Sequence, residues 1–482
     1  MSLKKKALNG FVWTFFEQFG RTGIRFIVQL ALARLIAPDQ FGLLGMIGVF
    51  YAIAETLSNT GMSQSLIRMS NPQDEDYNTV FWQNLIVSTT IYILVFIAAP
   101  FISEFYKQPI LSPIIKVYSL SIIIGCFSSI QFTKYTKELK FRDQTTVIIP
   151  SIIISSFLGI ILAFYGYGVW ALVYMQVAQS AVSAFQLWFK SDWRPKFKYS
   201  FERAKYHLTF GYKIMLAGLL NNIFINIYPM IIGKHNSPND VGFYTRALSF
   251  RSLPVTMTVG MFGKVTYSVL AQFKNDRDRF IEVFRKFLKV LLLISSFVLL
   301  AFVVVAKPLI LTLIGDLWLP SVKMFQLIAF GGVFIILQSY LSNILSIYGK
   351  SDLILKALIF SRIVNLIIIF TTAQLGIMAI IYGQILAEII NVFVIQIYCS
   401  SILKFSLLKQ YFDIIPILIP GFIIAAIVLI IFGKLEGVIK NKGIEIFINL
   451  MIFISLFVSS QYILNKKIVL EVFEMRKMFT KK

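Results

Sequence analysis

Three charged residues in the first long apolar segment are spaced so that they would lie on one face of a helix. Glu17, Arg21 and Arg25 are four positions apart, and Gln29 continues the series, a spacing that stacks side chains along a helix. Guanidinium groups stay charged in a low-dielectric setting and bind phosphate through two hydrogen bonds, so the stripe predicts recognition of an anion. The alternative is a Glu17–Arg21 ion pair that only helps the helix pack, and it leaves Arg25 unexplained.

Further charged residues fall inside apolar segments, where a charge costs at least about 2.5–3.5 kcal/mol at the bilayer centre. Cations outnumber carboxylates among them, which favours an anionic ligand, and phosphate or pyrophosphate fits best. We predict a diphosphate-binding site made by Arg21, Arg25, Lys213, Asn222, Arg246 and Arg251. For Arg246 the alternative is snorkelling to the outer surface.

Three carboxylates in the same segments are candidates for coupling transport to a proton or a sodium ion. They are Glu17, Glu55 and Glu388. A carboxylate in an apolar segment needs a partner or an ion, so the alternative is that each simply neutralises an arginine.

Sequence motifs that would indicate catalysis are missing. There is no G-x-x-x-x-G-K-[ST] loop, no G-x-S-x-G and no H-E-x-x-H, so neither nucleotide hydrolysis nor the common hydrolytic mechanisms are indicated. Cys126 and Cys399 fall inside apolar segments, and no disulfide framework is expected. His207 and His235 are too few for a metal site and are expected as interfacial or loop residues. We expect a non-enzyme without cofactor or metal.

The elements that carry these residues must be membrane-spanning helices. The chain is 57% hydrophobic and 14% charged, with a mean hydropathy of +0.77, whereas soluble domains average about 45–50% apolar and about 25% charged residues. A spanning helix needs about 20 mainly apolar residues. Fourteen stretches qualify: 11–36, 41–66, 79–102, 110–133, 144–165, 168–189, 206–232, 241–270, 281–305, 322–347, 354–375, 376–399, 411–432 and 444–464.

The basic residues alternate along the chain as membrane topology requires. Lys and Arg gather in the connections 134–142, 190–205 and 274–289, whereas 37–40 and 166–167 are nearly bare. This positive-inside bias places both termini in the cytoplasm. The last hairpin is the exception, because Lys434, Lys440 and Lys442 fall on the outer side. Topology thus accounts for the net charge of +23, and no nucleic-acid partner is expected.

Two pairs of similar motifs indicate an internal duplication. Residues 38–44, Pro-Asp-Gln-Phe-Gly-Leu-Leu, match residues 238–244, Pro-Asn-Asp-Val-Gly-Phe-Tyr, and Gly168-x-x-Ala171-x-x-Tyr174-x-Gln176 recurs from Gly376 to Gln384. The order of the matches is the same in both halves, which favours a repeat over chance.

The repeat predicts an all-α fold of two lobes and an accessory hairpin. Each copy holds six spans, 1–200 and 201–403, and an even number makes the copies parallel, related by an axis along the membrane normal with the substrate site between them. Residues 404–482 form the hairpin and a basic tail. We expect Arg25 and Arg251 to face one central cavity.

Local motifs resemble the polysaccharide transporter branch of the multidrug/oligosaccharidyl-lipid/polysaccharide (MOP) flippase superfamily, the Wzx-type lipopolysaccharide and exopolysaccharide flippases. The matching stretches are 33–42, 166–173, and 241–247 followed by Leu253-Pro254. The resemblance implies the MOP flippase fold and an inner-membrane protein of bacteria. It also implies a substrate, an oligosaccharide repeat unit on undecaprenyl pyrophosphate, moved to the outer leaflet by alternating access for lipopolysaccharide, capsule or exopolysaccharide assembly.

Two other function classes are weighed against the flippase. A drug/cation antiporter of the same superfamily would share the fold, but its cationic substrate should prefer acidic cavity residues. A membrane-embedded glycan polymerase or acyltransferase usually needs a sizeable loop that presents catalytic residues, and the outer loops here are short.

Overall fold

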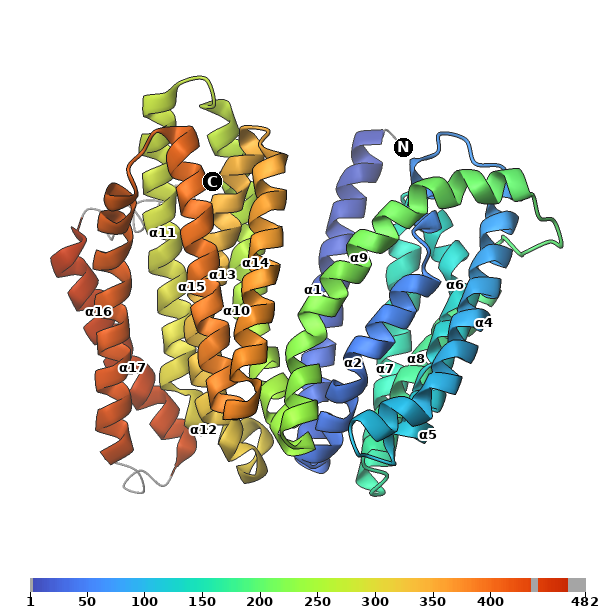
Figure 1. The fold of residues 1–482 in the computed structure, drawn as a ribbon, viewed down its shortest axis with the longest axis horizontal. Coiled ribbons are helices and arrows are strands. Elements are labelled where there is room, and N and C mark those ends of the chain that lie inside the picture. Colours follow the sequence, from blue (N-terminus) through green and yellow to red (C-terminus); the bar gives the residue numbers. More distant parts are fainter. Residues whose placement is uncertain (1–2, 435–440, 467–482) are drawn as a thin grey trace. The chain divides into compact units, whose positions relative to one another are not determined.

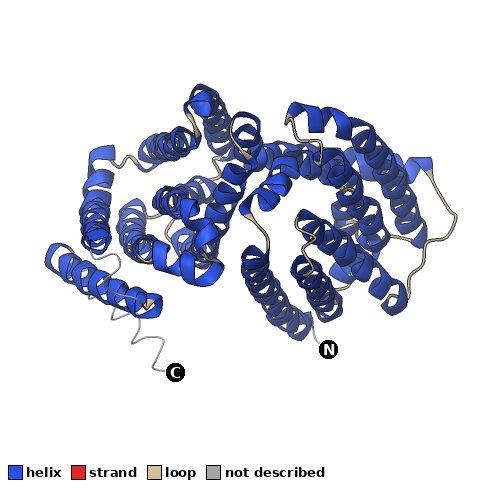
Figure 2. Ribbon diagram, turned by 90° about the horizontal axis from the view of Figure 1, so that it is seen from below, coloured by secondary structure: helices blue, strands red, loops and turns tan. Residues whose placement is uncertain are grey.

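The computed structural model describes residues 3–434 and 441–466, and every regular element in this part of the chain is a helix (Figure 2). By their contacts the helices fall into two compact units, Met1–Gly242 and Phe243–Lys482, and each builds its own core. The predicted basic tail at 467–482 and the loop residue Lys440 lie outside the described residues.

The first unit contains nine helices within its described residues, in the chain order of Figure 1. They are α1 (Leu3–Leu35), α2 (Pro38–Ser58), α3 (Met62–Arg68), α4 (Asp74–Phe105), α5 (Leu111–Tyr118), α6 (Leu120–Lys137), α7 (Phe141–Phe164), α8 (Val169–Lys190) and α9 (Phe201–His235). Helix α10 (Pro238–Gln272) begins in the last residues of this unit. The second unit continues with α11 (Arg277–Val304), α12 (Ala306–Ile314), α13 (Leu319–Ile347), α14 (Ser351–Thr372), α15 (Ile377–Leu403), α16 (Leu407–Lys434) and α17 (Lys442–Leu464).

Eleven helical segments in the described part of the chain are long and apolar enough to cross a membrane. Helices also occupy the other three predicted spans, as α1, α8 and α10, but these carry more polar side chains and do not meet the same criteria. The count of fourteen spanning helices therefore stays a prediction.

The predicted span 41–66 is divided into two helices. α2 ends at Ser58, and α3 begins at Met62 after a turn in which Thr60 and Gly61 have φ of 42° and 70°. Positive φ is rare for residues with a Cβ and costs little for glycine. The predicted span ran across this break although the residues from Ser58 to Gly61, Ser-Asn-Thr-Gly, are types that favour a turn.

The two copies of the first repeated motif lie against each other within the first unit. A Cβ placed on Gly42 would overlap the backbone carbonyl of Pro238, and one on Gly242 would overlap that of Pro38. The contact is reciprocal, as expected for equivalent surfaces related by a twofold operation. It explains why both motifs carry glycine at the same position.

Helix α9 packs on the first unit, along α2 and against α3 and α4. Its close contacts with α2 come from small residues: Gly218 lies beside Thr56, and Gly233 lies beside Met46. Small residues let helix backbones approach closely in membranes. The compact units thus divide at Gly242, whereas the predicted boundary at 200/201 separates copies of the sequence repeat and stays a prediction.

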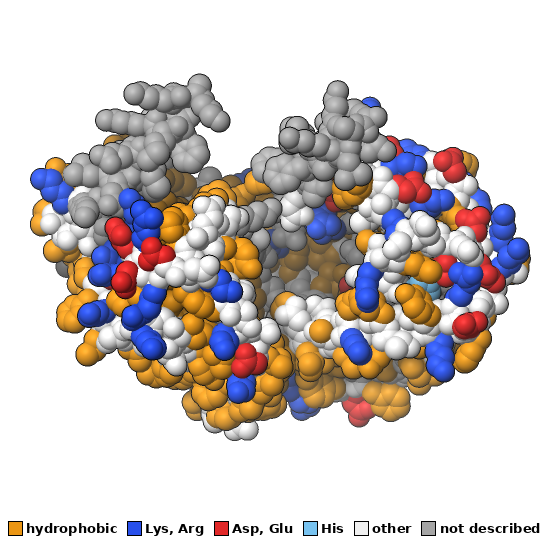
Figure 3. Space-filling view, turned by 90° about the horizontal axis from the view of Figure 1, so that it is seen from above, with side chains coloured by type: hydrophobic (Ala, Val, Ile, Leu, Met, Phe, Trp, Pro, Cys, Tyr) orange, Lys and Arg blue, Asp and Glu red, His pale blue; other side chains and the backbone are white. Residues whose placement is uncertain are grey.

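One end of the first unit gathers basic connections. Lys137 at the end of α6 donates to the carbonyls of Ile67 and Met69, and Trp82 donates to the Lys196 carbonyl in the α8–α9 connection at 2.8 Å. The space-filling view from above shows Lys and Arg side chains over this face (Figure 3). The arrangement agrees with the predicted clustering of positive charge, and the assignment of this end to the cytoplasm stays a prediction.

The second unit has a large aromatic and aliphatic core built by α11, α13, α15, α16 and α17. Phe284 stacks on Tyr340 with ring centroids 5.6 Å apart. The predicted accessory hairpin is joined to this core through the buried Asp413 of α16, which accepts from Arg285 at 2.6 Å and from Lys289 at 2.7 Å. Packing and a buried ionic cluster together hold α16 on α11.

Candidate functional site

A polar cavity of about 250 Å³ lies inside the first unit, among α2, α4, α6 and α8. Hydroxyl, amide and carboxylate groups provide most of its wall, which is unusual for the interior of an apolar helix bundle. Its lining includes Tyr51, Glu55, Ser58, Asn59, Asn84, Ser88, Ser121, Ser128, Ser129, Gln176 and Ser180.

Tyr51 connects three helices at this cavity. Its hydroxyl lies 3.0 Å from the Ser121 Oγ of α6, and Gln176 of α8 donates to it at 3.5 Å. Its ring packs edge-on to Tyr118, with centroids 4.6 Å apart. Glu55 lies one turn further along α2 and lines the same cavity. The predicted coupling carboxylate therefore lines a cavity large enough for a small ion, and the carboxylate itself can bind a proton.

The charged residues Glu17, Arg21 and Arg25, which we call the α1 stripe, extend along α1 to within electrostatic range of this carboxylate. Arg25 interacts with Glu55, and Glu17 interacts with Arg21. Arg25 is exposed, and among the described residues it makes no ion pair within 4.0 Å. The structure thus places Arg25 of α1 within electrostatic reach of Glu55 of α2, and Arg25 is exposed on α1.

The two predicted site residues of α9 differ in their surroundings. Asn222 donates to the Thr56 Oγ1 of α2 at 2.7 Å, one position from Glu55. Lys213 is exposed, with its amine 5.9 Å from the ring centroid of Tyr212. Asn222 therefore bonds α9 to α2 beside the cavity-lining Glu55. The Lys213 side chain is instead exposed on α9.

The predicted residues of the second unit are held by other side chains. The Arg251 Nη1 lies 3.1 Å from the Glu388 Oε1, and Gln384 donates to the same oxygen at 3.2 Å. Tyr244 in turn donates to Gln384 at 2.9 Å. The arginine predicted to bind phosphate and the carboxylate predicted to bind a coupling ion are thus each other's partners in this conformation.

Arg246 does not snorkel in this structure. Its residue is 5% exposed, and its guanidinium lies over the Trp318 ring, 5.1 Å from the centroid. A cation over an indole face is stabilised by the ring quadrupole. Arg246 is therefore packed into the second unit.

The repeat places the cavity and the ion pair at equivalent positions. The offset that aligns Gly42 with Gly242 also aligns Tyr51 with Arg251, and the offset that aligns Gln176 with Gln384 aligns Ser180 with Glu388. In the first unit these positions line the cavity. In the second they form the Arg251–Glu388 pair.

Comparison with known proteins places the chain. The model of a family described as polysaccharide biosynthesis protein matches residues 31–323. The chain belongs to the polysaccharide biosynthesis protein family.

Two relatives of this family member are named for the biosynthesis or transport of a polysaccharide or lipopolysaccharide. The succinoglycan biosynthesis transport protein ExoT of Rhizobium meliloti (strain 1021) is 21% identical over 64% of this chain, and the match covers 62% of its own length. The lipopolysaccharide biosynthesis protein WzxC of Escherichia coli (strain K12) is 23% identical over 75% of this chain and 74% of its own. The chain thus spans about three fifths of the length of the first relative.

Solved structures show the fold of this family member. The lipid II flippase MurJ in an inward closed conformation has a TM-score of 0.74 at 16% identity, covering 96% of this chain and all of that one. A multidrug resistance MATE family transporter of the MOP superfamily has a TM-score of 0.60 at 15% identity, covering 79% of this chain and 96% of that one. The predicted all-helical fold with MOP flippase-like neighbours is confirmed, whereas the arrangement of fourteen spans in two parallel lobes and a hairpin stays a prediction.

Sequence reasoning missed most of the neutral residues around the cavity of this family member. Asn84, Ser88 and Ser121 are neutral polar residues within largely apolar segments, and their types alone gave no signal. Gln176 did carry one, because it ends a repeated motif, but no role was assigned to it. No cluster of three or more His, Cys, Asp or Glu side chains able to hold a metal occurs among the described residues.

Proposed function

We propose that this protein is a flippase for an undecaprenyl-pyrophosphate-linked oligosaccharide repeat unit, which it moves from the cytoplasmic to the outer leaflet of a bacterial inner membrane. The observation that carries the proposal is the accessible Arg25 on α1 of a polysaccharide biosynthesis family member. Crossing by alternating access would keep the lipid tail in the bilayer while the charged head group passes through the protein. The product would serve lipopolysaccharide, capsule or exopolysaccharide assembly.

The diphosphate is proposed to bind first at the α1 stripe. Arg21 and Arg25 lie one turn apart, and a guanidinium binds phosphate oxygens in a bidentate manner. Lys213 and Asn222 of α9 supply a further charge and amide within the same unit. Arg251 would join only after it leaves Glu388, because a paired guanidinium has fewer donors to offer, and Arg246 would join only after leaving Trp318.

Glu55 is proposed as the coupling group. A single carboxylate surrounded by hydroxyl and amide oxygens suits a proton or a sodium ion better than a divalent cation, which usually takes more carboxylates. When Glu55 is protonated or holds sodium, it no longer neutralises Arg25, and diphosphate binding becomes more favourable. By reciprocity the bound diphosphate raises the affinity of Glu55 for the cation. Glu17 acts on Arg21 in the same manner, whereas Glu388 must first leave Arg251.

Export in cells tests this function. Cells that lack their own transporter for a surface polymer would receive the wild-type gene, Arg25→Ala, Arg25→Lys or Lys205→Ala, a matched control in an exposed position of α9. We expect export from the wild type and the control, none from alanine and partial export from lysine, at equal membrane levels. Wild-type export without polymer loss in Arg25→Ala would contradict the role of Arg25.

A drug/cation antiporter is the second candidate, favoured by the structural similarity to a MATE family transporter and by Glu55 at the cavity. Proteoliposomes loaded with a cationic dye separate the two. Dye export driven by a sodium or proton gradient supports the antiporter, and its absence beside oligosaccharide flipping supports the flippase.

A further inference from the structure

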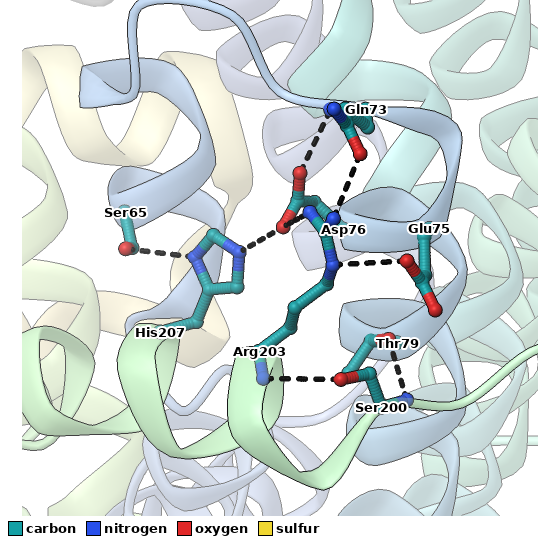
Figure 4. Close-up of polar contacts among 8 residues, drawn as sticks. All are labelled: Ser65, Gln73, Glu75, Asp76, Thr79, Ser200, Arg203 and His207. Atoms are coloured by element: carbon teal, nitrogen blue, oxygen red, sulfur yellow. Dashed lines mark hydrogen bonds and ion pairs between the residues drawn. The ribbon is translucent and has the colours of Figure 1, made fainter.

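A buried polar cluster ties the first turns of α9 to α3 and α4 (Figure 4). Its members are Ser65, Asp76, Arg203 and His207, which we call the α9 clamp. The His207 ring is fully buried, with Nδ1 2.9 Å from the Ser65 Oγ and Nε2 3.4 Å from the Asp76 Oδ1. The sequence did not predict this burial of the His207 ring.

Arg203 lies one turn before His207 on the same face of α9 and completes the clamp. Its Nη1 lies 2.7 Å from Asp76, its Nε lies 3.1 Å from Glu75, and its Nη2 donates to Gln73 at 2.7 Å. Asp76 is 1% exposed and also accepts from the Gln73 amide at 2.7 Å, which caps α4. A buried carboxylate with this many donors is a rigid anchor, because removing one partner leaves a desolvated charge.

The order of contacts from Ser65 to His207 to Asp76 is that of a hydrolytic triad, but the surroundings exclude this use. Ser65 is 4% exposed, so a substrate cannot reach its hydroxyl. Arg203 takes the carboxylate that would orient the imidazole. With a carboxylate acceptor at Nε2, a neutral His207 carries its proton there and accepts from Ser65 at Nδ1. The cluster is an anchor and not a nucleophile.

The α9 clamp is connected to the cavity through backbone and side chains. Gly211, one turn past His207, approaches Gly61 so closely that a Cβ on Gly61 would overlap the Gly211 carbonyl. The adjoining Thr60 donates to the Asn84 Oδ1 at 2.8 Å, and Asn84 lines the cavity. Displacing this end of α9 would therefore move the turn that supports the cavity wall.

We propose that Asp76, Arg203 and His207 are positioning residues for transport that keep α9 attached to the first unit throughout the cycle. The inference rests on the proposed function. It adds that α9 moves together with the first unit, although α9 begins the second copy of the sequence repeat. Its consequence is that Lys213 and Asn222 keep a fixed place relative to Glu55 and Arg25. The clamp needs no substrate to form, so its test separates from that of flipping.

Hydrogen exchange tests the attachment in the purified full-length protein without substrate. We expect amides of residues 203–211 to exchange at least about tenfold faster in Arg203→Ala than in the wild type, because local opening becomes easier. Arg203→Lys should recover part of the protection, and the matched control Lys205→Ala should leave it unchanged. Equal exchange in Arg203→Ala and the wild type would overturn the clamp.

A reconstituted flipping assay then tests positioning. We expect KM for lipid-linked oligosaccharide to rise roughly three- to tenfold in Arg203→Ala with kcat within about twofold, since ligands on α9 are displaced while the chemistry of Arg25 is kept. A variant that only misfolds would lower the amount of active protein and leave KM unchanged, which would overturn the positioning role. If the wild type does not flip, the proposed function fails, and hydrogen exchange still decides whether the clamp holds α9.

Cross-linking tests whether the attachment persists. Ser65→Cys and His207→Cys would be introduced with Cys126→Ser and Cys399→Ser and joined to each other by oxidation to a disulfide, since a bulky reagent could not reach these buried positions. We expect the cross-linked protein to transport at least as fast as the same protein before cross-linking. Loss of transport on cross-linking, reversed by reduction, would show that α9 leaves the first unit and would overturn the inference.

Discussion

The two units carry equivalent sequence positions with different interiors. Tyr51 and Ser180 line a polar cavity in the first unit, while their repeat equivalents Arg251 and Glu388 form an ion pair in the second. Glutamine is kept in both: Gln176 donates to Tyr51, and Gln384 donates to Glu388. Gln384 and Glu388 both lie on α15, and Gln384 reaches α10 by accepting from Tyr244. The glutamine of the repeated motif thus contacts α2 in one unit and α10 in the other, through different partner residues.

The difference separates two uses of buried polarity. In the second unit both charges are largely buried, with side chains 13% and 12% exposed, and they pair through the Glu388 Oε1, while the Glu388 Oε2 is buried without a hydrogen bond. In the first unit Glu55 lines a space and Arg25 is exposed. Charges that satisfy each other hold a structure in place, whereas a carboxylate beside a cavity can exchange an ion. We therefore assign ion exchange and the first ligand contact to the first unit.

The largest expected effect is on stability in the second unit. Glu388→Gln leaves the Arg251 guanidinium buried without its counter-charge, and breaking one side of such a pair costs about 3–5 kcal/mol. Denaturant unfolding in detergent would measure it, with Glu55→Gln as the matched control in the first unit. If Glu388→Gln and Glu55→Gln lower the free energy of unfolding equally, the contrast between the units is lost.

The next effect is on ligand affinity in the first unit. Arg25→Ala removes a charge-assisted contact worth about 1.5–3 kcal/mol, so we expect roughly ten- to a hundredfold weaker binding of lipid-linked diphosphate. Binding to purified protein in nanodiscs is the measurement. Arg25→Lys should keep part of the affinity, since lysine retains the charge and loses the fork. Unchanged affinity in the alanine variant would make the α1 stripe structural.

Glu55→Gln should act on coupling more than on stability. The variant cannot be deprotonated, so it should transport with little dependence on an imposed sodium or proton gradient while its Tm stays near that of the wild type. Flipping rates with and without each gradient provide the test. A variant whose gradient dependence matches that of the wild type would remove Glu55 from the coupling mechanism.

The smallest effect is expected from Tyr51→Phe. The change deletes one hydroxyl with partners in Ser121 and Gln176, and a net hydrogen bond contributes about 0.5–1.5 kcal/mol. The Tm measured by thermal unfolding should fall slightly. A loss as large as that of Glu388→Gln would show that the polar cavity is a structural network like the pair in the second unit.

Sequence patterns predicted the helices well because apolar length and the need to satisfy backbone groups leave little choice in a membrane. The spacing of Glu17, Arg21 and Arg25 also predicted a shared face. Contacts between segments far apart in the sequence could not be predicted. No local pattern indicates, for example, that Arg251 pairs with Glu388. The burial of His207 likewise depends on its contacts with Ser65 of α3 and Asp76 of α4, which no local pattern around His207 reveals.

Packing also decided which helices form a unit. The repeat motifs predicted a boundary near residue 200, but the small residues of α9 fit against α2, so contacts divide the chain at Gly242. An internal sequence repeat shows which segments are equivalent. It does not show which helices each segment packs against.

The most direct test of the central claim is the initial rate of flipping of lipid-linked oligosaccharide in proteoliposomes, compared for the wild type, Arg25→Ala and the exposed control Lys205→Ala. The account predicts flipping by the wild type and the control, and a loss of roughly ten- to a hundredfold in Arg25→Ala at subsaturating substrate. Wild-type protein that fails to flip, or Arg25→Ala that flips at the wild-type rate, would contradict it.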